Sequence, residues 1–384
     1  MKTQVKHSLI VISCLFLMAQ SGHHPLLFSS HSQAAFLALH PHSFYQAQSR
    51  IVLHALPDAT IRSLSKLAQP EIAFEWAIRL AKQGLYTRSR VYWQRYLNDA
   101  SQAQVIRLAA LLKAANDINA ISLIASKRRL PRHYLDWLSL HRGVLPSAFN
   151  SERLAAHNMS SPLDSVTFAR ECINRVLVLT DHLAAVKKLK QFKIRYTSAP
   201  EPSVWSYCFS EPIYIGDTMQ CTPDNSQFAY CDVAALKRAY PAMLPQGDKA
   251  LMMTRQGNAN VRGDMMTLNT QSQYAVFMHE LMHFSGFEDE YSVPKQKAKW
   301  LCQRAGRHAP NLYVGELNDA PKGWVKSNTC NYGALQAYKP SEGWSIMEYQ
   351  TRPLTAQYRR LWQQAINAQH AKRWVKSERL GLTE

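Results

Sequence analysis

The sequence is short of acidic residues: its 384 residues include 27 Asp and Glu against 45 Lys and Arg, a formal net charge of +18. This imbalance predicts attraction to anionic surfaces through the long-range electrostatic field, without identifying one. A nucleic-acid signature, such as an RNP1 or helix-turn-helix pattern, is also missing, so we expect no nucleic-acid partner. Hydrophobic residues make up 46% of the chain, which excludes an intrinsically disordered protein.

Long apolar runs are missing as well. After residue 22, no stretch approaches the roughly 20 apolar residues of a membrane-spanning helix, so we expect no transmembrane segment in the mature protein. At the start, Lys2 and Lys6 precede an apolar run from Leu9 to Ala19, which is typical of a secretory signal over residues 1–22. We therefore expect a secreted or periplasmic protein. Lipoprotein anchoring at Cys14 is the weaker alternative, because about five apolar residues precede it and a signal core needs roughly 7 to 15.

Cysteine is absent from residues 23–171, and no two cysteines have the C-x-x-C spacing of a zinc ribbon. The even number that remains after the signal, in a chain bound for an oxidising compartment, predicts up to three disulfides. We expect Cys302 to pair with Cys330. The asymmetry also indicates a domain boundary near residue 150. The six residues are Cys172, Cys208, Cys221, Cys231, Cys302 and Cys330.

The cysteine-free part is expected to form an all-α domain of helical hairpins over residues 58–143, because apolar residues recur there at helical spacing. The segment from Gly84 to Leu97 resembles the turn and second helix of a tetratricopeptide repeat, whose helix pairs recur about every 34 residues. That resemblance implies a protein partner for this domain. An irregular helical bundle without a partner groove remains the alternative. Residues 23–57 form a leader of uncertain role, and residues 144–164, rich in Pro, Ser and Asn, read as a linker.

Residues 165–384 are expected to form a second domain of mixed helices and strands, which makes the chain α+β overall. We predict a long helix over 166–191, then a strand over 192–197. Two further strands, 251–254 and 264–268, are expected around a turn at Gly257–Asn260. The remaining predictions are a strand at 213–215 and helices at 233–240, 270–285 and 355–375.

The helix expected over 270–285 contains the pattern H-E-x-x-H, formed by His279, Glu280 and His283. On a helix, residues at i and i+4 share one face and lie about 5 to 6 Å apart, so both imidazoles can bind one zinc ion. Glu280 lies beside them, where its carboxylate can take a proton from water activated by the metal. The pattern therefore predicts a zinc site with a glutamate general base.

Gly286 follows His283 by three residues, and Asp289 follows Gly286 by three. A glycine there can end the helix and turn the chain back toward the metal. The whole string resembles the metzincin zinc peptidases, whose pattern is H-E-x-x-H-x-x-G-x-x-H followed by a Met-turn. Asp289 stands where most members have their third histidine, so the resemblance implies that Asp289 is the third ligand, with Glu288 and Glu290 as adjacent competitors.

The string from Ser345 to Tyr349 has the pattern S-x-M-x-Y and resembles the Met-turn of several metzincins. The resemblance implies that Met347 packs beneath the histidines and that Tyr349 binds the metal or stabilises the tetrahedral intermediate. It also implies a zincin fold: a long helix, a mixed sheet whose edge strand pairs with substrate, the active-site helix, an irregular lower subdomain, the Met-turn and a last helix.

Three other interpretations stay open at this stage. The third ligand could be a glutamate from a later helix, such as Glu316 or Glu342, as in gluzincins. The motif could instead belong to an inactive, metal-stabilised module that binds an anionic envelope polymer or a protein partner. The last is that the histidines are ordinary residues of an amphipathic helix. We expect a zinc metallopeptidase acting on a peptide or protein, more an endopeptidase than an exopeptidase, with Zn²⁺ as cofactor.

Overall fold

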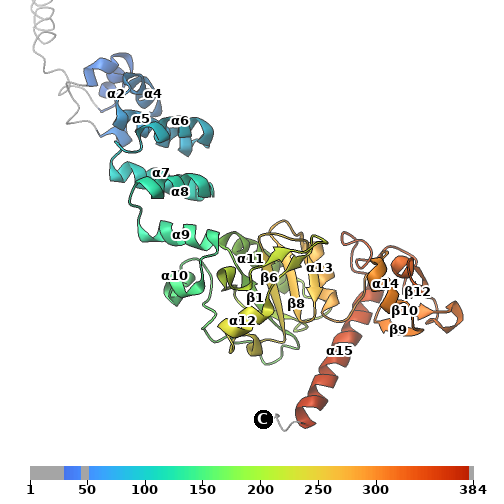
Figure 1. Cartoon of the computed structure of the whole chain (residues 1–384). Helices are drawn as coiled ribbons and strands as arrows, with labels where there is room; N and C mark the ends of the chain where they lie inside the picture. Colours follow the sequence, from blue (N-terminus) through green and yellow to red (C-terminus); the bar gives the residue numbers. More distant parts are fainter. Residues whose placement is uncertain (1–29, 45–51, 380–384) are drawn as a thin grey trace, which may run out of the picture. The chain divides into compact units, whose positions relative to one another are not determined.

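The computed structural model of the protein describes residues 30–44 and 52–379 (Figure 1). The expected signal peptide over 1–22, including Cys14, lies outside the described residues, as does part of the 23–57 leader. The chain divides into two compact units between Leu138 and Ser139. None of the described helices is both long enough and apolar enough to cross a membrane. A helical N-terminal region followed by helices and sheets confirms the mixed fold.

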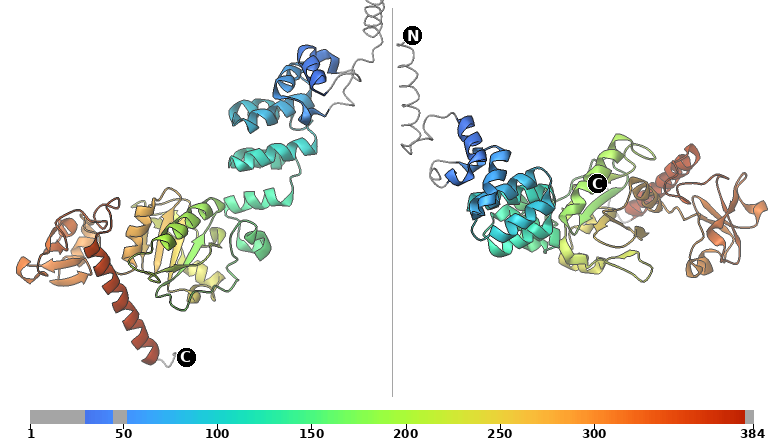
Figure 2. Two further views of the ribbon diagram at one scale, coloured as in Figure 1. Left: turned by 180° about the vertical axis from the view of Figure 1, so that it is seen from behind. Right: turned by 90° about the horizontal axis from the view of Figure 1, so that it is seen from above.

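The described residues of the first unit form helices and no strand, as expected from the apolar spacing. Successive helices pack as antiparallel pairs, drawn from blue to teal in Figure 2. The resemblance to a tetratricopeptide repeat remains a prediction. The helices are α2 (Ser30–Leu39), α4 (Asp58–Leu64), α5 (Pro70–Lys82), α6 (Tyr86–Tyr96), α7 (Gln102–Ala114), α8 (Ile118–Lys127) and α9 (Arg132–Arg142), whose last residues belong to the second unit.

The boundaries of these helices follow from local sequence. Pro70 occupies the first turn of α5, where its missing N–H costs nothing. Gly84, at φ +78°, ends the α5 region and starts the turn into α6. The two helices then pack closely, since the buried Ser89 hydroxyl donates to the Ala77 carbonyl at 2.7 Å. α7 begins with a capping box, in which Ser101 and Gln104 satisfy each other's backbone N–H groups.

The most buried carboxylate described in the first unit is that of Glu75 on α5, which is 1% exposed. Arg107 of α7 donates to both of its oxygens, at 2.8 and 3.0 Å, and Arg79 donates to Oε1 at 3.2 Å. The planar guanidinium of Arg107 matches the carboxylate geometry. Both oxygens of this buried group are therefore satisfied by side chains of the same unit.

The second unit is built on a mixed sheet with strand order β2-β1-β6-β8-β7, in which β3 also pairs with β1. Strands β1, β6 and β8 are parallel neighbours, and the edge strand β7 is antiparallel to β8. The expected strands at 251–254 and 264–268 are confirmed as β6 and β8, but they are parallel neighbours rather than a hairpin. The strands are β1 (Arg175–Thr180), β2 (Cys208–Phe209), β3 (Ile213–Tyr214), β6 (Lys249–Thr254), β7 (Asn260–Arg262) and β8 (Met265–Asn269).

The first elements of this unit correct two expectations. The long helix predicted over 166–191 is wrong, because Arg175–Thr180 form strand β1. The strand predicted over 192–197 is wrong as well, because these residues belong to helix α11 (Leu183–Ser198). A short apolar run such as that of β1 fits a buried helix and a buried parallel strand equally well, and only pairing along both edges decides between them.

The two faces of the sheet carry separate cores. Val176 and Val178 point toward a core that includes α11, α13 (Tyr274–His283) and α15 (Ala356–Arg379). Leu177 and Leu179 point to the other face, toward α12 (Val233–Ala239). Because side chains alternate along a strand, one β1 sequence supplies both cores. The helices expected near 233–240, 270–285 and 355–375 are thus confirmed as α12, α13 and α15.

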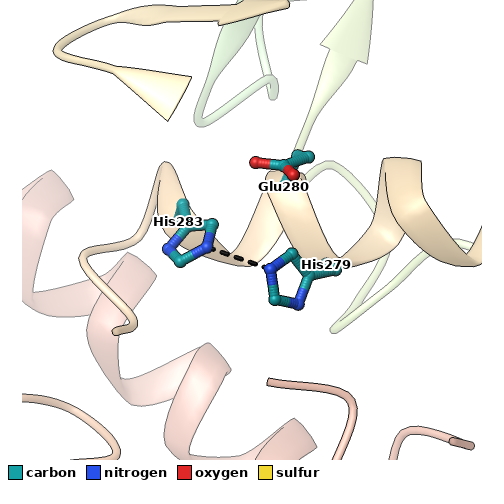
Figure 3. Close-up of side chains that lie close together, drawn as sticks. All are labelled: His279, Glu280 and His283. Atoms are coloured by element: carbon teal, nitrogen blue, oxygen red, sulfur yellow. Dashed lines mark hydrogen bonds between the residues drawn. The ribbon is translucent and has the colours of Figure 1, made fainter. Parts of the chain in front are cut away.

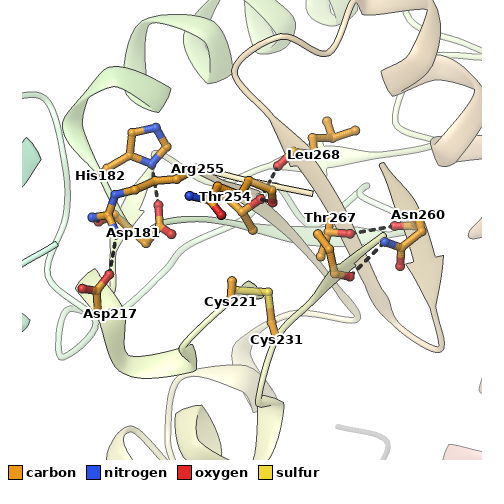
Figure 4. Close-up of a disulfide and its surroundings, with 12 residues drawn as sticks. Asp181, His182, Asp217, Cys221, Cys231, Thr254, Arg255, Asn260, Thr267 and Leu268 are labelled. Atoms are coloured by element: carbon orange, nitrogen blue, oxygen red, sulfur yellow. Dashed lines mark hydrogen bonds and ion pairs between the residues drawn. A yellow bond between two sulfur atoms is a disulfide. The ribbon is translucent and has the colours of Figure 1, made fainter. Parts of the chain in front are cut away.

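A polar cluster lies where β1 and β6 end (Figure 4). Arg255, directly after β6, donates to the Asp217 carboxylate at 2.6 Å and to the Asp181 carbonyl at 2.9 Å. The buried Asp181 and His182 side chains pair with each other next to it. These contacts join the ends of two strands to the loop that carries the Cys221–Cys231 disulfide.

The residues expected to be a linker fold with the second unit. They contain the short helix α10 (Ser151–Ala155), and the buried Leu154 and Met159 share a core cluster with Val186 and Tyr214. Pro, Ser and Asn are common in linkers, but here Asn150 caps α10 by accepting from the Arg153 N–H at 2.9 Å.

After α13 the chain forms helix α14 (Lys295–Leu301) and a separate antiparallel sheet of order β11-β12-β10-β9, which together enclose a small core. The expected Cys302–Cys330 disulfide is confirmed and joins α14 to this sheet. Cys172–Cys208 and Cys221–Cys231 are the other pairs. Three disulfides are typical of an oxidising compartment. The strands are β9 (Gly306–Ala309), β10 (Leu312–Gly315), β11 (Val325–Ser327) and β12 (Gln336–Lys339).

Candidate metal centre

The two histidines of the H-E-x-x-H pattern lie on α13 as predicted, with their imidazoles next to each other (Figure 3). The Nε2 atoms of His279 and His283 are 3.2 Å apart, and the ring planes make an angle of 86°. His279 is 1% exposed. The C-terminal end of α13 is fixed from two directions, since the Ser285 hydroxyl contacts Tyr207 at 2.6 Å and accepts from Trp362 at 2.9 Å.

The other nitrogen of each histidine contacts a backbone carbonyl. His279 Nδ1 is 2.9 Å from the Ile346 carbonyl, and His283 Nδ1 is 2.7 Å from the Phe287 carbonyl. A carbonyl can only accept, so each Nδ1 must carry the proton and donate. With Nδ1 protonated, each imidazole in its neutral form would present its Nε2 lone pair to the same point, as metal-binding histidines do.

Gly286 turns the chain back as expected. Its φ of +81° lies in the left-handed region, and its N–H donates to the His283 carbonyl at 2.9 Å. The turn brings Asp289 Oδ1 to 3.3 Å from His279 Nε2 and 3.2 Å from His283 Nε2. Thus the structure brings together His279, His283 and Asp289.

These three ligand atoms fit a metal ion. Zinc bonds of about 2.0 to 2.1 Å at tetrahedral angles place neighbouring ligand atoms about 3.3 to 3.4 Å apart, close to the observed edges of 3.2, 3.2 and 3.3 Å. Asp289 Oδ1 is also buried without a hydrogen-bond partner among the described residues. Three acceptor atoms that face one another require a cation between them, either protons or a metal.

Glu280 is the other acidic member of this cluster. His279, Glu280 and His283 each place one ligand atom within 4.8 Å of the others, and Glu280 is 4% exposed. Burial raises the pKa of its carboxyl, and the two nearby histidines oppose that shift. A carboxylate beside the ligands with a raised pKa suits proton transfer more than metal binding.

The charges of the cluster favour a bound cation. Burial alone would lower the pKa of His283, but the adjacent Asp289 and Glu280 carboxylates outweigh it and raise this pKa to about 9. Burial alone would raise the pKa of Asp289, but the two adjacent imidazoles hold it well below its usual range. Without a metal, the cluster therefore keeps a proton on His283 through neutral pH.

The two acidic neighbours of Asp289 have other partners. Glu290 is fully buried, and its carboxylate accepts from Ser345, Tyr358 and Asn311 at 2.5, 2.6 and 2.8 Å. Glu288 pairs with Lys297 of α14 at 2.5 Å. Asp289 is thus the one acidic residue of the three, all described, whose carboxylate reaches the histidines.

The Met-turn residues separate into two groups. Met347 is fully buried in the core that contains α13, and its carbonyl accepts from the Glu290 N–H at 3.0 Å. Tyr349 is 48% exposed, and its ring packs against Trp344 with centroids 4.6 Å apart. Met347 thus lies in the hydrophobic core on which α13 packs. The ring of Tyr349 contacts Trp344 rather than the proposed metal ligands.

Sequence reasoning missed the residues that hold Asp289 in place. The fully buried Asn311 clamps the backbone of Glu288 by accepting from its N–H at 2.9 Å and donating to its carbonyl at 2.7 Å. The Thr329 hydroxyl donates to the Asp289 carbonyl at 2.8 Å. These residues lie 22 and 40 positions after Asp289, and no local pattern marks them.

Tyr291 was also missed. Burial and the adjacent carboxylates of Asp289, Glu280 and Glu288 raise the pKa of its phenol, although the side chain is 40% exposed. It therefore lies at the mouth of the cluster. Tyr291 comes two residues after Asp289 in the sequence, and this proximity was the available signal.

The alternative ligands Glu316 and Glu342 are exposed, and among the described residues Asp289 is the carboxylate within 4 Å of both histidines. The gluzincin alternative is therefore not favoured by the geometry. Comparisons with protein-family models, with curated proteins and with solved structures find no match for this chain.

Proposed function

We propose that the second unit is a zinc-dependent peptidase. The observation that carries the proposal is the triangle of His279 Nε2, His283 Nε2 and Asp289 Oδ1, with edges of 3.2 to 3.3 Å and the buried Glu280 beside it. A structural zinc site uses four protein ligands and has no need of an adjacent glutamate. Three ligands and a spare carboxylate are the donor set of a catalytic site.

His279, His283 and Asp289 would hold the ion. Bound there, zinc would act as a Lewis acid toward a peptide carbonyl and lower the pKa of water. Glu280 takes the proton from the attacking water and then gives it to the leaving amine. Its raised pKa supports the second role, because a more basic carboxylate holds the proton until the amine leaves.

The order of elements supports the metzincin resemblance. The active-site helix α13 follows a mixed sheet with an antiparallel edge strand, β7. A smaller sheet, the Met-turn and the last helix α15 come after it. In this proposal Met347 supports the ligands, and Tyr349 moves off Trp344 to assist the reaction when substrate binds. The three disulfides support a secreted or periplasmic site of action.

The test of the proposal is Glu280→Gln. Zinc content should stay near that of the wild type, because Glu280 is not a ligand, while hydrolysis of a broad peptide library should fall by at least about a hundredfold. Glu316→Gln, at an exposed glutamate, is the control and should leave both unchanged. Wild-type turnover in Glu280→Gln would exclude this mechanism.

A second role, attachment to an anionic envelope surface, is favoured by helix α11. The helix contains Lys187, Lys188, Lys190, Lys193 and Arg195 and no acidic residue, and Ile194 between them is 69% exposed. Such a face is attracted to anionic headgroups or polymers and loses that attraction as salt screens it.

Retention on phosphatidylglycerol-containing vesicles tests this role. Between about 50 and 200 mM salt it should fall steeply for the wild type. It should be weak throughout for the double variant Lys187→Glu/Lys190→Glu. Lys66→Glu/Lys82→Glu, which makes the same charge change at exposed positions of the first unit, should behave like the wild type. Salt-independent retention of the wild type would exclude the role.

A further inference from the structure

Three consecutive acidic residues, Glu288, Asp289 and Glu290, follow the turn at Gly286, and each has a different environment. Glu290 is committed to the protein interior, since it accepts hydrogen bonds from three side chains. Asp289 points Oδ1 at both histidines. The side chain of Glu288 is one methylene group longer than that of Asp289. Some contact must therefore keep the Glu288 carboxylate away from the metal centre.

That contact comes from helix α14. Lys297 Nζ lies 2.5 Å from Glu288 Oε2 and 3.7 Å from Asp289 Oδ2, the second oxygen of that carboxylate. Its side chain is 29% exposed, against 21% and 14% for the two carboxylates, so solvent screens these contacts only in part. The Lys297 ammonium therefore forms ion pairs with two consecutive carboxylates.

We propose that Lys297 selects Asp289 as the third ligand, a positioning role that rests on the proposed metal site. The ammonium pairs with the Glu288 carboxylate and with Oδ2 of Asp289, so that Asp289 Oδ1 is the carboxylate oxygen within 4 Å of both histidines. Through their shared contact, Glu288 Oε2 and Asp289 Oδ2 lie no more than about 6.2 Å apart. Without Lys297, a divalent cation would draw both carboxylates, since each is a suitable ligand.

The selection also affects the chemistry. An anionic ligand lowers the net charge of a zinc site relative to a third histidine, and a second carboxylate would lower it again. Excess carboxylate ligation weakens the ion as a Lewis acid and fills the position that water must occupy. Lys297 thus keeps an aspartate-containing site open and electrophilic.

A double-mutant cycle on zinc affinity tests the role without an activity assay. In the wild-type background, Asp289→Ala should weaken zinc binding by more than about a hundredfold, since even outer-shell changes cost about 10- to 100-fold. In the Lys297→Met background the same substitution should cost at least about tenfold less, because Glu288 is released to replace Asp289. Adding Glu288→Gln should restore the full loss.

Two controls isolate the charge of Lys297. Lys297→Arg keeps the charge, and Lys299→Met removes a charge from an exposed position of the same helix, so Asp289→Ala should cost the wild-type amount in both. Zinc affinities would come from chelator competition, on variants shown to be folded by their thermal transitions. If Lys297→Met fails to fold, Lys297→Gln takes its place.

A second readout is the visible spectrum of the Co²⁺-loaded protein. Its intensity should fall in Lys297→Met as Glu288 joins the ligands and raises the coordination number, and it should recover in Lys297→Met/Glu288→Gln. Equal costs of Asp289→Ala with and without Lys297, together with an unchanged spectrum, would overturn the inference and leave the metal site intact. Absence of zinc binding by the wild type would instead contradict the proposed function itself.

Discussion

The two units each bury a carboxylate against basic side chains, and the two arrangements differ in one respect. In the first unit, Glu75 has a hydrogen-bond donor on both oxygens from Arg107 and Arg79. In the second unit, Asp289 Oδ1 lies against two ring nitrogens and has no hydrogen-bond partner among the described residues. The first cluster is complete as a structural ion pair, whereas in the second one carboxylate oxygen is left for a proton or a metal ion to complete.

The difference distinguishes a carboxylate that belongs to the folded structure alone from a carboxylate that binds a ligand. A buried charge with all its partners is at most a neutral contributor to stability, and losing one partner is costly. A buried oxygen left without a donor is destabilising, unless something outside the chain completes it. On this basis, the Glu75 cluster should respond to mutation through stability alone, and the Asp289 cluster through metal binding.

The largest expected effect is that of removing zinc. A ligand present at about a thousand times its dissociation constant stabilises the native state by about 4 kcal/mol. Chelation should therefore increase hydrogen exchange in peptides from α13 and residues 287–291, while peptides from α5 and α7 stay unchanged. Equal exchange with and without chelator in the second unit would remove the distinction between the two clusters.

Disrupting the Glu75 cluster should lower the stability of the first unit and leave zinc binding unchanged. Arg107→Ala leaves one oxygen of the buried Glu75 unpaired and should destabilise the first unit by about 2 to 3 kcal/mol. Zinc content should not change. Urea unfolding measures the first effect and mass spectrometry the second, with Arg88→Ala at an exposed position of α6 as the control, expected within about 0.5 kcal/mol of the wild type.

Tyr358→Phe tests whether the buried Glu290 carboxylate supports the metal centre. The buried Tyr358 hydroxyl donates to Glu290 at 2.6 Å, so its removal should destabilise the second unit by about 2 kcal/mol. Zinc affinity should also fall, by about tenfold, because Glu290 anchors the chain next to Asp289. Tyr338→Phe is the matched control, since the buried Tyr338 ring packs against Tyr313. A loss of stability without a loss of affinity would limit Glu290 to a structural role.

Per pH unit, the effect of pH is the smallest of those expected. Zinc must displace the proton that Asp289 and Glu280 hold on His283, whose pKa is raised from 6.5 to about 9. Apparent zinc affinity should therefore fall about tenfold for each pH unit below 9. In the metal-free protein the sign is opposite: the protonated pair stabilises the fold fully below pH 6.5 and is lost as the pH rises through about 9. Chelator competition from pH 6 to 9 measures the first slope.

The parts of the metal centre that could be predicted are those encoded by local spacing. The i, i+4 histidines need only the helix, and Gly286 needs only a left-handed turn to bring Asp289 back. Met347 could be placed because the Met-turn has its own pattern. Asn311, Thr329 and Lys297 could not, because each reaches residues 288–289 through a tertiary contact.

The errors in the fold have the same origin. Arg175–Thr180 became a strand because neighbours on both edges pair with it, and Phe192 and Tyr196 became helical because α11 packs them onto the sheet. The paired residues lie 33 or more positions apart in the sequence. Helices of the first unit were predictable because their hydrogen bonds are local and their ends are marked by Pro70, Gly84 and Ser101.

The most direct test of the central claim is the metal content of the mature protein, purified without added metal or chelator, measured by mass spectrometry beside His283→Ala. The account predicts about one zinc per chain in the wild type and its loss in the variant, because two of three ligands cannot hold the ion tightly. A folded wild-type protein with its disulfides formed and no bound metal would contradict the claim. The unpartnered oxygen of Asp289 would then be satisfied by the His283 proton alone.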